Sequence, residues 1–259
     1  MKADILSLDG KKLRQIELPE QFHEEYRNDL IKRSILAIFS QERQRYGVYY
    51  RAGKGSAAKL SRRRRAYKGA YGHALSRIPR KTMWKRGTQF GWVGAWAPGT
   101  VGGRKSHPPK AEKIFAVKIN QKEMKKALRS VLSFVASKGK LIILEKKFED
   151  LIKIKEVENV FKNLKLEQAL ERAKERKVRG GKGKLRGRRY KKKLGPLIIV
   201  NDVCNLVKSA RNLAGVDIVE IKNLKTTSVV GGTSGKEIPR DVIITEDAIA
   251  KMKDERLFI

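Results

Sequence analysis

Arginine and lysine side chains alternate with aromatic rings between residues 43 and 111, a stretch that contains no aspartate or glutamate. It carries 18 Lys and Arg residues together with all three tryptophans of the chain. Guanidinium groups form paired hydrogen bonds with phosphate oxygens, and aromatic rings stack on unpaired bases. The 11 glycines of the stretch let the backbone approach a ligand closely. These residue types therefore predict binding to a polyanion with accessible bases, namely RNA.

A second, shorter segment has the same character. Residues 176–193 carry 11 Lys and Arg residues and again no acid. The whole chain has 61 Lys and Arg against 27 Asp and Glu, a net charge of +34. A merely soluble basic enzyme is the alternative, but surface charge kept for solubility usually mixes both signs and leaves only about 2–8 net charges. Phosphates that neutralise the excess, and release counterions as they do so, explain it better.

The side chains that we expect to contact RNA are mostly cations of these two segments. In the first segment they are Arg51, Lys54, Lys59, Arg62, Arg63, Arg64, Arg65, Lys68, Arg77, Arg80, Lys81, Trp84, Lys85, Arg86, Arg104, Lys105, His107 and Lys110. In the second they are Arg179, Lys182, Lys184, Arg186, Arg188 and Arg189. A run such as 62–65 is elsewhere often a localisation signal or a solvated surface, but its acid-free surroundings favour RNA contact. A disordered tail would lack aromatics, so the tryptophans either stack on RNA or pack in a small local core.

Two glycine-rich stretches resemble phosphate-binding loops and depart from the motif at the residues that matter. In Gly99–Ser106, Arg104 stands where a glycine must precede the lysine, and prolines follow instead of a helix. In the stretch 231–236, the first glycine is one residue too close, and Glu237 replaces the hydroxyl that would bind magnesium. Nucleotide hydrolysis is therefore not expected.

The remaining reactive side chains form no catalytic or metal-binding constellation. His23, His73 and His107 are scattered, without metal-ligand spacing to another ligand, so we expect neither metal nor cofactor. Cys204, the single cysteine, follows an apolar run and fits a core position better than a nucleophile. Two competing functions stay open: an RNA-modifying or RNA-cleaving enzyme, which would need carboxylates or a histidine in a pocket, and a DNA-compacting protein, which would not prefer RNA.

Outside the basic segments, apolar periodicity predicts alternating strands and helices. We expect strands at 5–8, 13–16, 114–119, 141–144, 197–200, 216–221 and 242–244. We expect helices at 26–43, 120–135, 157–164, 166–175, 202–213 and from 245 on, with Asn120, Asp202 and Thr245 as N-caps. This order predicts a three-layer, mostly parallel, Rossmann-like α/β sheet with a long irregular basic loop inserted.

The expected organisation is a globular α/β domain of residues 1–42 and 112–259, an extended RNA-binding loop of residues 43–111 inserted in it, and a second basic loop at 176–193. No apolar run reaches the roughly 18 residues of a transmembrane helix, and the N-terminus lacks the apolar core of a signal peptide. With one cysteine, no internal disulfide is possible. We expect a reducing, cytoplasmic location and no membrane partner.

Three stretches carry a resemblance to a known family: Tyr71–Arg80, Gly102–Lys110, and Arg179–Tyr190, which runs on into Gly195–Asp202. In their order and spacing around an α/β core, they resemble the archaeal and eukaryotic branch of ribosomal protein L-four. The resemblance covers essentially the whole chain. It implies a structural, non-enzymatic protein of the large ribosomal subunit.

The resemblance implies a globular domain on the outer surface of the subunit and a basic loop that reaches into large-subunit rRNA. It implies rRNA binding early in assembly, contact with neighbouring ribosomal proteins, and a monomer within the ribosome. The loop tip, placed in Arg80–Trp96, would line the peptide exit tunnel, with Arg80, Trp84, Arg86, Phe90 and Trp92 as candidates. The chain stops at Ile259, without the long extension of eukaryotic members, which favours the archaeal form.

Overall fold

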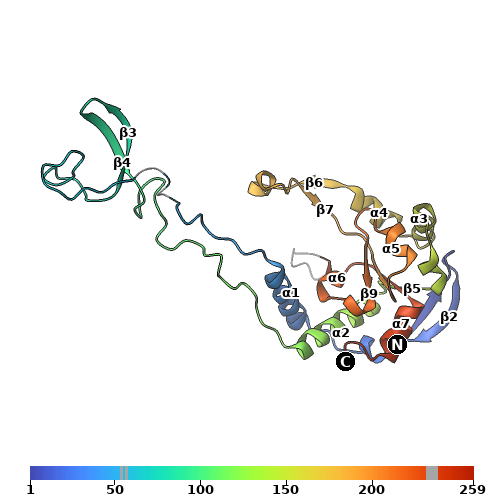
Figure 1. The fold of residues 1–259 in the computed structure, drawn as a ribbon. Helices are drawn as coiled ribbons and strands as arrows, with labels where there is room; N and C mark the ends of the chain where they lie inside the picture. The colour runs from blue at the N-terminus through green and yellow to red at the C-terminus, as the bar shows by residue number, and fades with distance from the viewer. Residues whose placement is uncertain (53–54, 56–57, 232–238) are drawn as a thin grey trace. The chain divides into compact units, whose positions relative to one another are not determined.

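The computed structural model describes residues 1–52, 55, 58–231 and 239–259 and divides into two compact units (Figure 1). Unit 1 comprises residues 1–41 and 117–259, and unit 2 comprises residues 42–116. Almost all regular secondary structure belongs to unit 1, whereas unit 2 contains one β-hairpin.

Unit 1 alternates strands and helices along the chain. Its strands are β1 (Lys2–Leu6), β2 (Lys12–Glu17), β5 (Leu141–Leu144), β6 (Arg176–Val178), β7 (Tyr190–Lys192), β8 (Leu197–Val200), β9 (Asp217–Glu220) and β10 (Val242–Thr245). Its α-helices are α1 (Asn28–Glu42, whose last residue belongs to unit 2), α2 (Gln121–Ser137), α3 (Ile154–Asn163), α4 (Glu167–Lys174), α5 (Asn205–Ala210), α6 (Thr226–Val230) and α7 (Glu246–Asp254). Short 3-10 helices lie at η1 (Glu20–Phe22), η2 (Lys146–Asp150), η3 (Gly181–Arg186) and η4 (Ile221–Asn223).

Six strands form the central sheet, in the order β2-β1-β5-β10-β8-β9. All neighbouring pairs are parallel except β1–β2, a hairpin that turns at Gly10 with a positive φ of 79°. The predicted mostly parallel α/β sheet is thus confirmed. The last strand, β10, lies in the middle of the sheet, whereas the final strands of a Rossmann fold follow one another outward. The Rossmann-like detail of the prediction therefore does not hold for the strand order.

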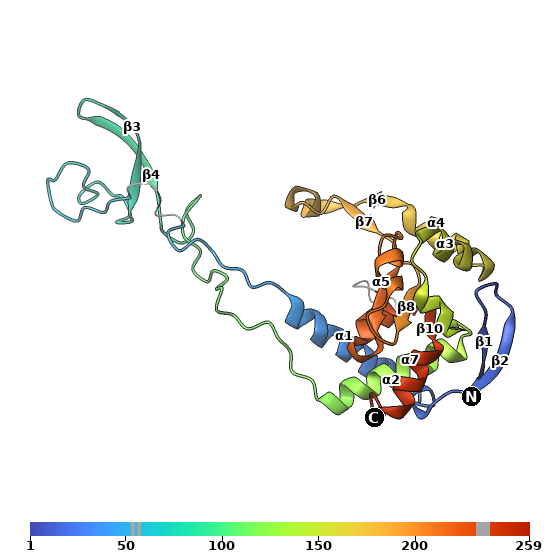
Figure 2. The ribbon, with the colours of Figure 1, turned by 45° about the vertical axis from the view of Figure 1, so that its right-hand side comes forward.

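Helices cover both faces of this sheet, which gives three layers (Figure 2). The central strands are apolar at consecutive residues and buried on both sides: Leu197 and Ile199 face one cluster, Ile198 and Val200 the other. The first cluster packs against α1, α2, α6 and α7, and the second against α3, α4 and α5.

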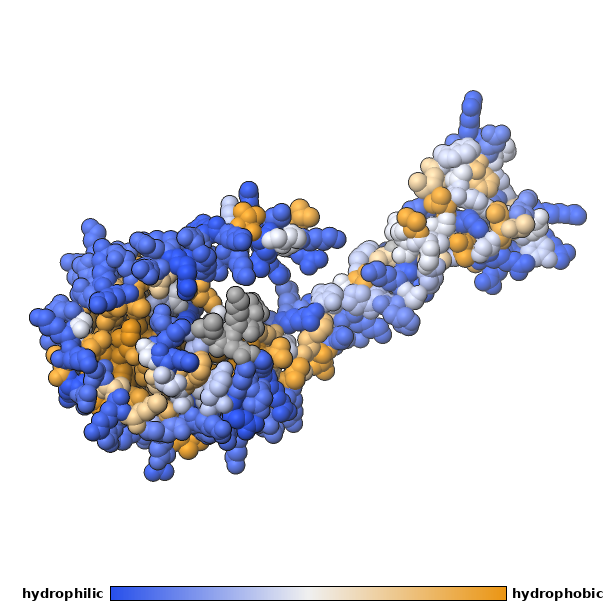
Figure 3. Space-filling model, turned by 180° about the vertical axis from the view of Figure 1, so that it is seen from behind, coloured by the Kyte–Doolittle hydropathy of each residue, from blue (hydrophilic) through white to orange (hydrophobic). Residues whose placement is uncertain are grey.

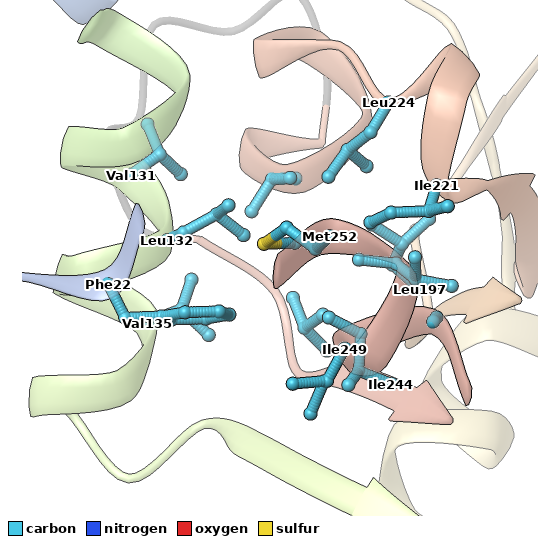
Figure 4. Packing of buried hydrophobic residues seen from close by; sticks show 14 of the residues in the cluster. Phe22, Val131, Leu132, Val135, Leu197, Ile221, Leu224, Ile244, Ile249 and Met252 are labelled. Atoms are coloured by element: carbon cyan, nitrogen blue, oxygen red, sulfur yellow. The ribbon is translucent and has the colours of Figure 1, made fainter. Parts of the chain in front are cut away.

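Side chains from η1, α2 and α7 converge in the first cluster. Phe22, Leu132 and Met252 meet there over Leu197 and Ile244 of the sheet (Figure 4). All five have a relative exposure of 0%. Burial of each such side chain contributes about 1.5–3 kcal/mol relative to leaving it exposed. The hydrophobic core therefore stabilises the fold of unit 1.

Two local predictions in unit 1 and its border are wrong. Residues 114–119 alternate in polarity but form no strand in the described structure; Ile114 is 71% exposed, and the Val117 amide donates to the Ser40 hydroxyl instead of a neighbouring strand. The helix expected from Asp202 to Leu213 begins after Cys204 and ends at Ala210. Asp202 does not cap it, because its carboxylate pairs with Lys251 at 2.5 Å.

The predicted caps at Asn120 and Thr245 do precede α2 and α7, although neither side chain bonds the helix backbone. The Thr245 hydroxyl instead donates to the Glu149 carboxylate at 2.5 Å. Of the helices in the described ranges, none combines the length and apolar composition that a membrane span needs.

Unit 2 differs from the irregular loop that its sequence suggests. Residues 80–94 form an antiparallel hairpin of β3 (Arg80–Arg86) and β4 (Gln89–Gly94), connected at Gly87 with a positive φ of 57°. Lys59 extends it by pairing its backbone with Arg80. The expectation of no regular structure is therefore wrong for this part of the segment.

Candidate nucleic-acid interface

Among its described residues, unit 2 has no hydrophobic core of its own. The buried apolar residues among its described positions are three alanines, Ala70, Ala95 and Ala97. Ordering each residue of a chain costs about 1–2 kcal/mol of backbone entropy, which so little apolar burial does not offset. The hydrophobic residues visible on unit 2 in Figure 3 lie at its surface among hydrophilic ones. Packing within unit 2 therefore contributes little stability, and most of its side chains are exposed and able to contact another molecule.

Ion pairs among the described residues do not neutralise the positive charge of unit 2. Its acids, Glu42 and Glu112, lie at its two ends. No Lys or Arg among its described residues forms an ion pair, whereas unit 1 contains many ion pairs. Each of these cations thus keeps its full charge available for a ligand.

Aromatic rings hold several of the cations in place instead of carboxylates. The guanidinium carbons of Arg64 and Arg77 both lie 4.8 Å from the ring centroid of Tyr71, and Arg64 also donates to the Tyr71 hydroxyl at 2.7 Å. Arg104 lies 5.7 Å from the ring of Trp96. Cation–π contacts at exposed sites contribute about 0.5–1 kcal/mol each. Two guanidiniums at one ring, in a segment without acids, have the charge and hydrogen-bond donors that a phosphate would need.

Two aromatic rings of the β3–β4 hairpin form a cluster with a ring from the preceding segment. Phe90 makes edge contacts with Trp92 at 5.0 Å and with Tyr67 at 5.4 Å. Arg80 lies 5.0 Å from the Trp92 ring, and Lys68 lies 5.3 Å from that of Phe90. Some aromatic rings thus pack against one another, which was one of the two alternatives left open by the sequence. The cations next to these rings make the surface of the cluster positively charged.

The second basic segment forms a separate hairpin in unit 1, in which like charges face each other. β6 and β7 pair so that Arg176 is opposite Lys192 and Lys177 is opposite Lys191. Like charges directly across an antiparallel pair are destabilising. Because neighbouring pairs point to opposite faces, both faces of the hairpin are positive.

The tip of this hairpin displays the predicted side chains. The 3-10 helix η3 ends at Arg186, and the following Gly187, with a φ of +76°, caps it and closes the turn. The basic residues predicted here, Arg179, Lys182, Lys184, Arg186, Arg188 and Arg189, are all exposed. Arg179 is held by a bond from its Nε to the Arg188 carbonyl at 3.2 Å. The tip therefore presents cations from a fixed backbone.

The base of the hairpin is attached to the sheet by glycines. The Gly195 amide donates to the Gly215 carbonyl at 2.9 Å, and a Cβ on Gly215 would lie 2.7 Å from the Cβ of Ala173. An ion pair joins Lys193 to Glu175 and holds the pKa of the Glu175 carboxyl below its usual range. Glu175 stands just before the acid-free segment, so it anchors the hairpin without neutralising its tip.

The predicted site residues fall into two groups, one in each unit. Lys54 lies outside the described residues, as does the second glycine-rich motif from residue 232 on. Arg64, Lys68, Arg77 and Arg80 are brought against aromatic rings as described above. Exposed side chains for which the described structure shows no hydrogen bond, ion pair or cation–π contact belong to Arg62, Arg63, Arg65, Lys105, His107 and Lys110.

Sequence reasoning missed four features of the site. Tyr71, the centre of the two-arginine cluster, and Gly91, against which Trp84 packs, were not named as site residues. The β3–β4 hairpin was detectable, because β-branched and aromatic residues flank the two-residue connection Gly87-Thr88. No sequence signal identifies the cross-strand pairing of like charges in β6–β7.

The described residues contain no group of three or more His, Cys, Asp or Glu side chains placed to hold a metal ion. Burial raises the pKa of the half-buried Cys204 thiol, which disfavours the nucleophilic thiolate. The first glycine-rich motif, 99–106, lies in turns with no helix after it.

The fold and the two basic elements define an α/β protein with a basic segment of residues 43–111 inserted in its domain and a second at 176–193, neither of which contains an acid. Comparison with known sequences identifies the family: the ribosomal protein L4/L1 family matches residues 16–255. The chain belongs to the ribosomal protein L4/L1 family.

Its relatives include archaeal proteins called "large ribosomal subunit protein uL4". That of Nanoarchaeum equitans is 40% identical over 270 residues, covering 100% of both chains. Those of Methanococcus vannielii and Methanocaldococcus jannaschii are each 38% identical over 269 residues, covering 98% of this chain and 99% of theirs. The resemblance seen in the sequence is thereby confirmed.

Proposed function

We propose that the protein is a structural constituent of the large ribosomal subunit, in the cytoplasm, and that it binds large-subunit rRNA through unit 2 and the β6–β7 hairpin. One observation carries this proposal: among the described residues, no cation of unit 2 forms an ion pair. The family to which the chain belongs is named for ribosomal proteins, which agrees with it. Phosphates supply the missing negative charge, and their counterions are released.

Residues 43–111 act in this proposal as one RNA-binding loop, inserted in a globular domain of residues 1–42 and 112–259. The segment 176–193 acts as a second. The predicted cations of both supply phosphate contacts, and the aromatic rings beside them stack on unpaired bases. Unit 1 is the folded platform, since it has the hydrophobic core that unit 2 lacks.

The lack of a core in unit 2 supports binding early in assembly. Arg65, Lys68, Ala74 and Trp96 all have positive φ values, between 49° and 59°, a region that costs non-glycine residues about 1 kcal/mol or more. Contacts with rRNA compensate that strain. RNA that folds around the segment then encloses it, which requires that the protein bind before the surrounding rRNA closes. Neighbouring ribosomal proteins contact the assembled monomer.

The β3–β4 hairpin is the tip of the loop in this proposal and lines the peptide exit tunnel. It contains all five candidates, Arg80, Trp84, Arg86, Phe90 and Trp92, within its two strands. A two-stranded hairpin is narrow and presents side chains on both faces, so it suits a tunnel wall formed together with RNA.

Co-sedimentation tests the proposal directly. The protein should stay with the large ribosomal subunit after a high-salt wash. Trypsin should cleave residues 43–111 in the free protein and spare them in the subunit. Release of the protein by the wash would contradict a structural role, and equal protection without RNA would contradict ordering on RNA. Binding to isolated rRNA should exceed binding to duplex DNA in competition; equal affinity would favour DNA compaction instead.

A further inference from the structure

Trp84 packs flat against the backbone of its cross-strand neighbour. It is paired with Gly91 in the β3–β4 register, and a Cβ built on Gly91 would lie 2.1 Å from Nε1 and 2.6 Å from Cε2 of the indole. Any residue larger than glycine would therefore displace the ring. An aromatic that covers a glycine in this way also stabilises the hairpin.

More than half of the Trp84 side chain is nevertheless open to solvent. Trp84 is 56% exposed, although one side of its ring is covered. The other rings of the hairpin are engaged: Phe90 contacts Trp92 and Tyr67, and Trp92 carries Arg80. Within the part of the chain that the structure describes, no ring or cation occupies the indole of Trp84.

We propose that Trp84 and Gly91 form a stacking platform for one unpaired nucleobase of the bound RNA. Gly91 holds the ring in position before binding, so the base meets a fixed surface. The neighbouring Lys85 and Arg86 are exposed and supply charge for the adjoining phosphates. A passing peptide carries no fixed negative charge to satisfy these cations, which favours RNA as the occupant. The platform deepens the proposed rRNA binding and rests on it.

The platform predicts a dependence on bases that phosphate contacts alone do not produce. Single-stranded poly(U) offers unstacked bases, duplex RNA conceals them, and polyphosphate has none. Stacking of a base on an aromatic ring changes affinity by roughly 5- to 150-fold. A contact to phosphate alone affects all three ligands similarly.

The experiment compares the full-length protein with Trp84→Leu, Gly91→Ala and the control Met83→Ala, a neighbouring residue that is 62% exposed. We expect Trp84→Leu to weaken poly(U) binding roughly 5- to 150-fold and to leave polyphosphate binding within about twofold. Gly91→Ala should have the same selectivity, because its methyl group displaces the indole. Met83→Ala should change neither affinity. Quenching of tryptophan fluorescence by poly(U), lost in Trp84→Leu, reports the stacking itself.

Each other outcome overturns the platform. An unchanged poly(U) affinity in Trp84→Leu, with quenching intact, would leave the indole free for another partner such as a peptide. An equal loss for poly(U) and polyphosphate would mean that Trp84 acts only by stabilising the hairpin. If the unaltered protein bound neither poly(U) nor large-subunit rRNA, the proposed function itself would fail, which separates the two hypotheses.

Discussion

Arg176 and Lys192 face each other across the β6–β7 hairpin as cross-strand partners, with no acid in the segment to separate their charges. This pairing predicts a trade-off between stability and binding. Lys192→Glu should stabilise the free hairpin, because an opposite-charge cross-strand pair contributes roughly 0.2–1 kcal/mol. It should weaken rRNA binding more than Lys192→Gln does. Hydrogen exchange of the hairpin amides and rRNA affinity measure the two effects.

Lys155→Glu is the matched control. It changes the charge by the same amount as Lys192→Glu, but Lys155 is an exposed residue of α3 in unit 1 and lies outside both basic segments. It should alter rRNA affinity much less than Lys192→Glu. Equal weakening by the two substitutions would show that net charge alone, and not the position of the hairpin, governs binding.

The cluster of Arg64, Arg77 and Tyr71 predicts a change in the salt dependence of binding. For the unaltered protein, the plot of log affinity against log salt should be steeper than about −3, as expected for several phosphate contacts. Arg77→Gln should make it shallower by roughly 0.7, the value for one contact to single-stranded RNA. Tyr71→Phe keeps the ring and removes only the hydroxyl that Arg64 contacts, so it should leave the slope unchanged. An unaltered slope in Arg77→Gln would exclude a phosphate contact there.

The parallel sheet of unit 1 was predictable because two of its inner strands, β5 and β8, are apolar at every position. Leu197–Val200 and Leu141–Leu144 are continuous apolar runs, typical of strands buried on both faces. Their order was not predictable. The insertion of β10 between β5 and β8 depends on contacts between residues far apart in the sequence. Periodicity also failed at 114–119, since alternation alone does not provide a partner strand.

The chemistry of the candidate interface was predictable from residue types, whereas its geometry was not. A segment rich in Lys and Arg and without acids predicts a polyanionic ligand, whatever the positions of its side chains in space. The approach of Arg64 and Arg77 to one ring, and of Trp84 to Gly91, depends on contacts through space. Local rules even oppose the β6–β7 pairing, because they disfavour opposed cations. Opposed cations lower the stability of the hairpin. Such a conflict with local preferences is expected where residues are selected for binding a ligand and not for stability.

Two glycines with similar backbone angles should differ in their tolerance of a methyl group. Gly139 and Gly215 have φ values of +65° and +75°, but only Gly215 is crowded, by Ala173 at 2.7 Å and Gly195 at 3.0 Å. Gly139→Ala should therefore cost about 1–2 kcal/mol for the backbone alone. Gly215→Ala should cost about 2–5 kcal/mol, because overpacking is added. Urea unfolding measures both; equal losses would show that the attachment of the β6–β7 hairpin is not tightly packed.

Acid should remove part of the stability of unit 1 through Asp29. A paired hydrogen bond from Arg27, at 3.0 and 2.7 Å, lowers the pKa of Asp29 from 3.8 to about 2 at the start of α1. A lowered folded-state pKa means that the unfolded chain takes up the proton first. The contribution of Asp29 is therefore complete above about pH 4 and is lost as the pH falls toward about 2.

The comparison of the unaltered protein with Asp29→Asn isolates this effect. The variant should unfold at a lower urea concentration at about pH 5. The difference should be small near pH 2, where about half of Asp29 is protonated in the folded protein, and should vanish below that pH. Glu171→Gln, at an exposed position of α4 without an ion pair in the described structure, should show no such pH-dependent difference. Because Arg27 and Asp29 are both exposed, high salt should reduce the difference at about pH 5. A difference that persisted unchanged at about pH 2 would mean that Asp29 acts through the geometry of the helix start and not through its charge.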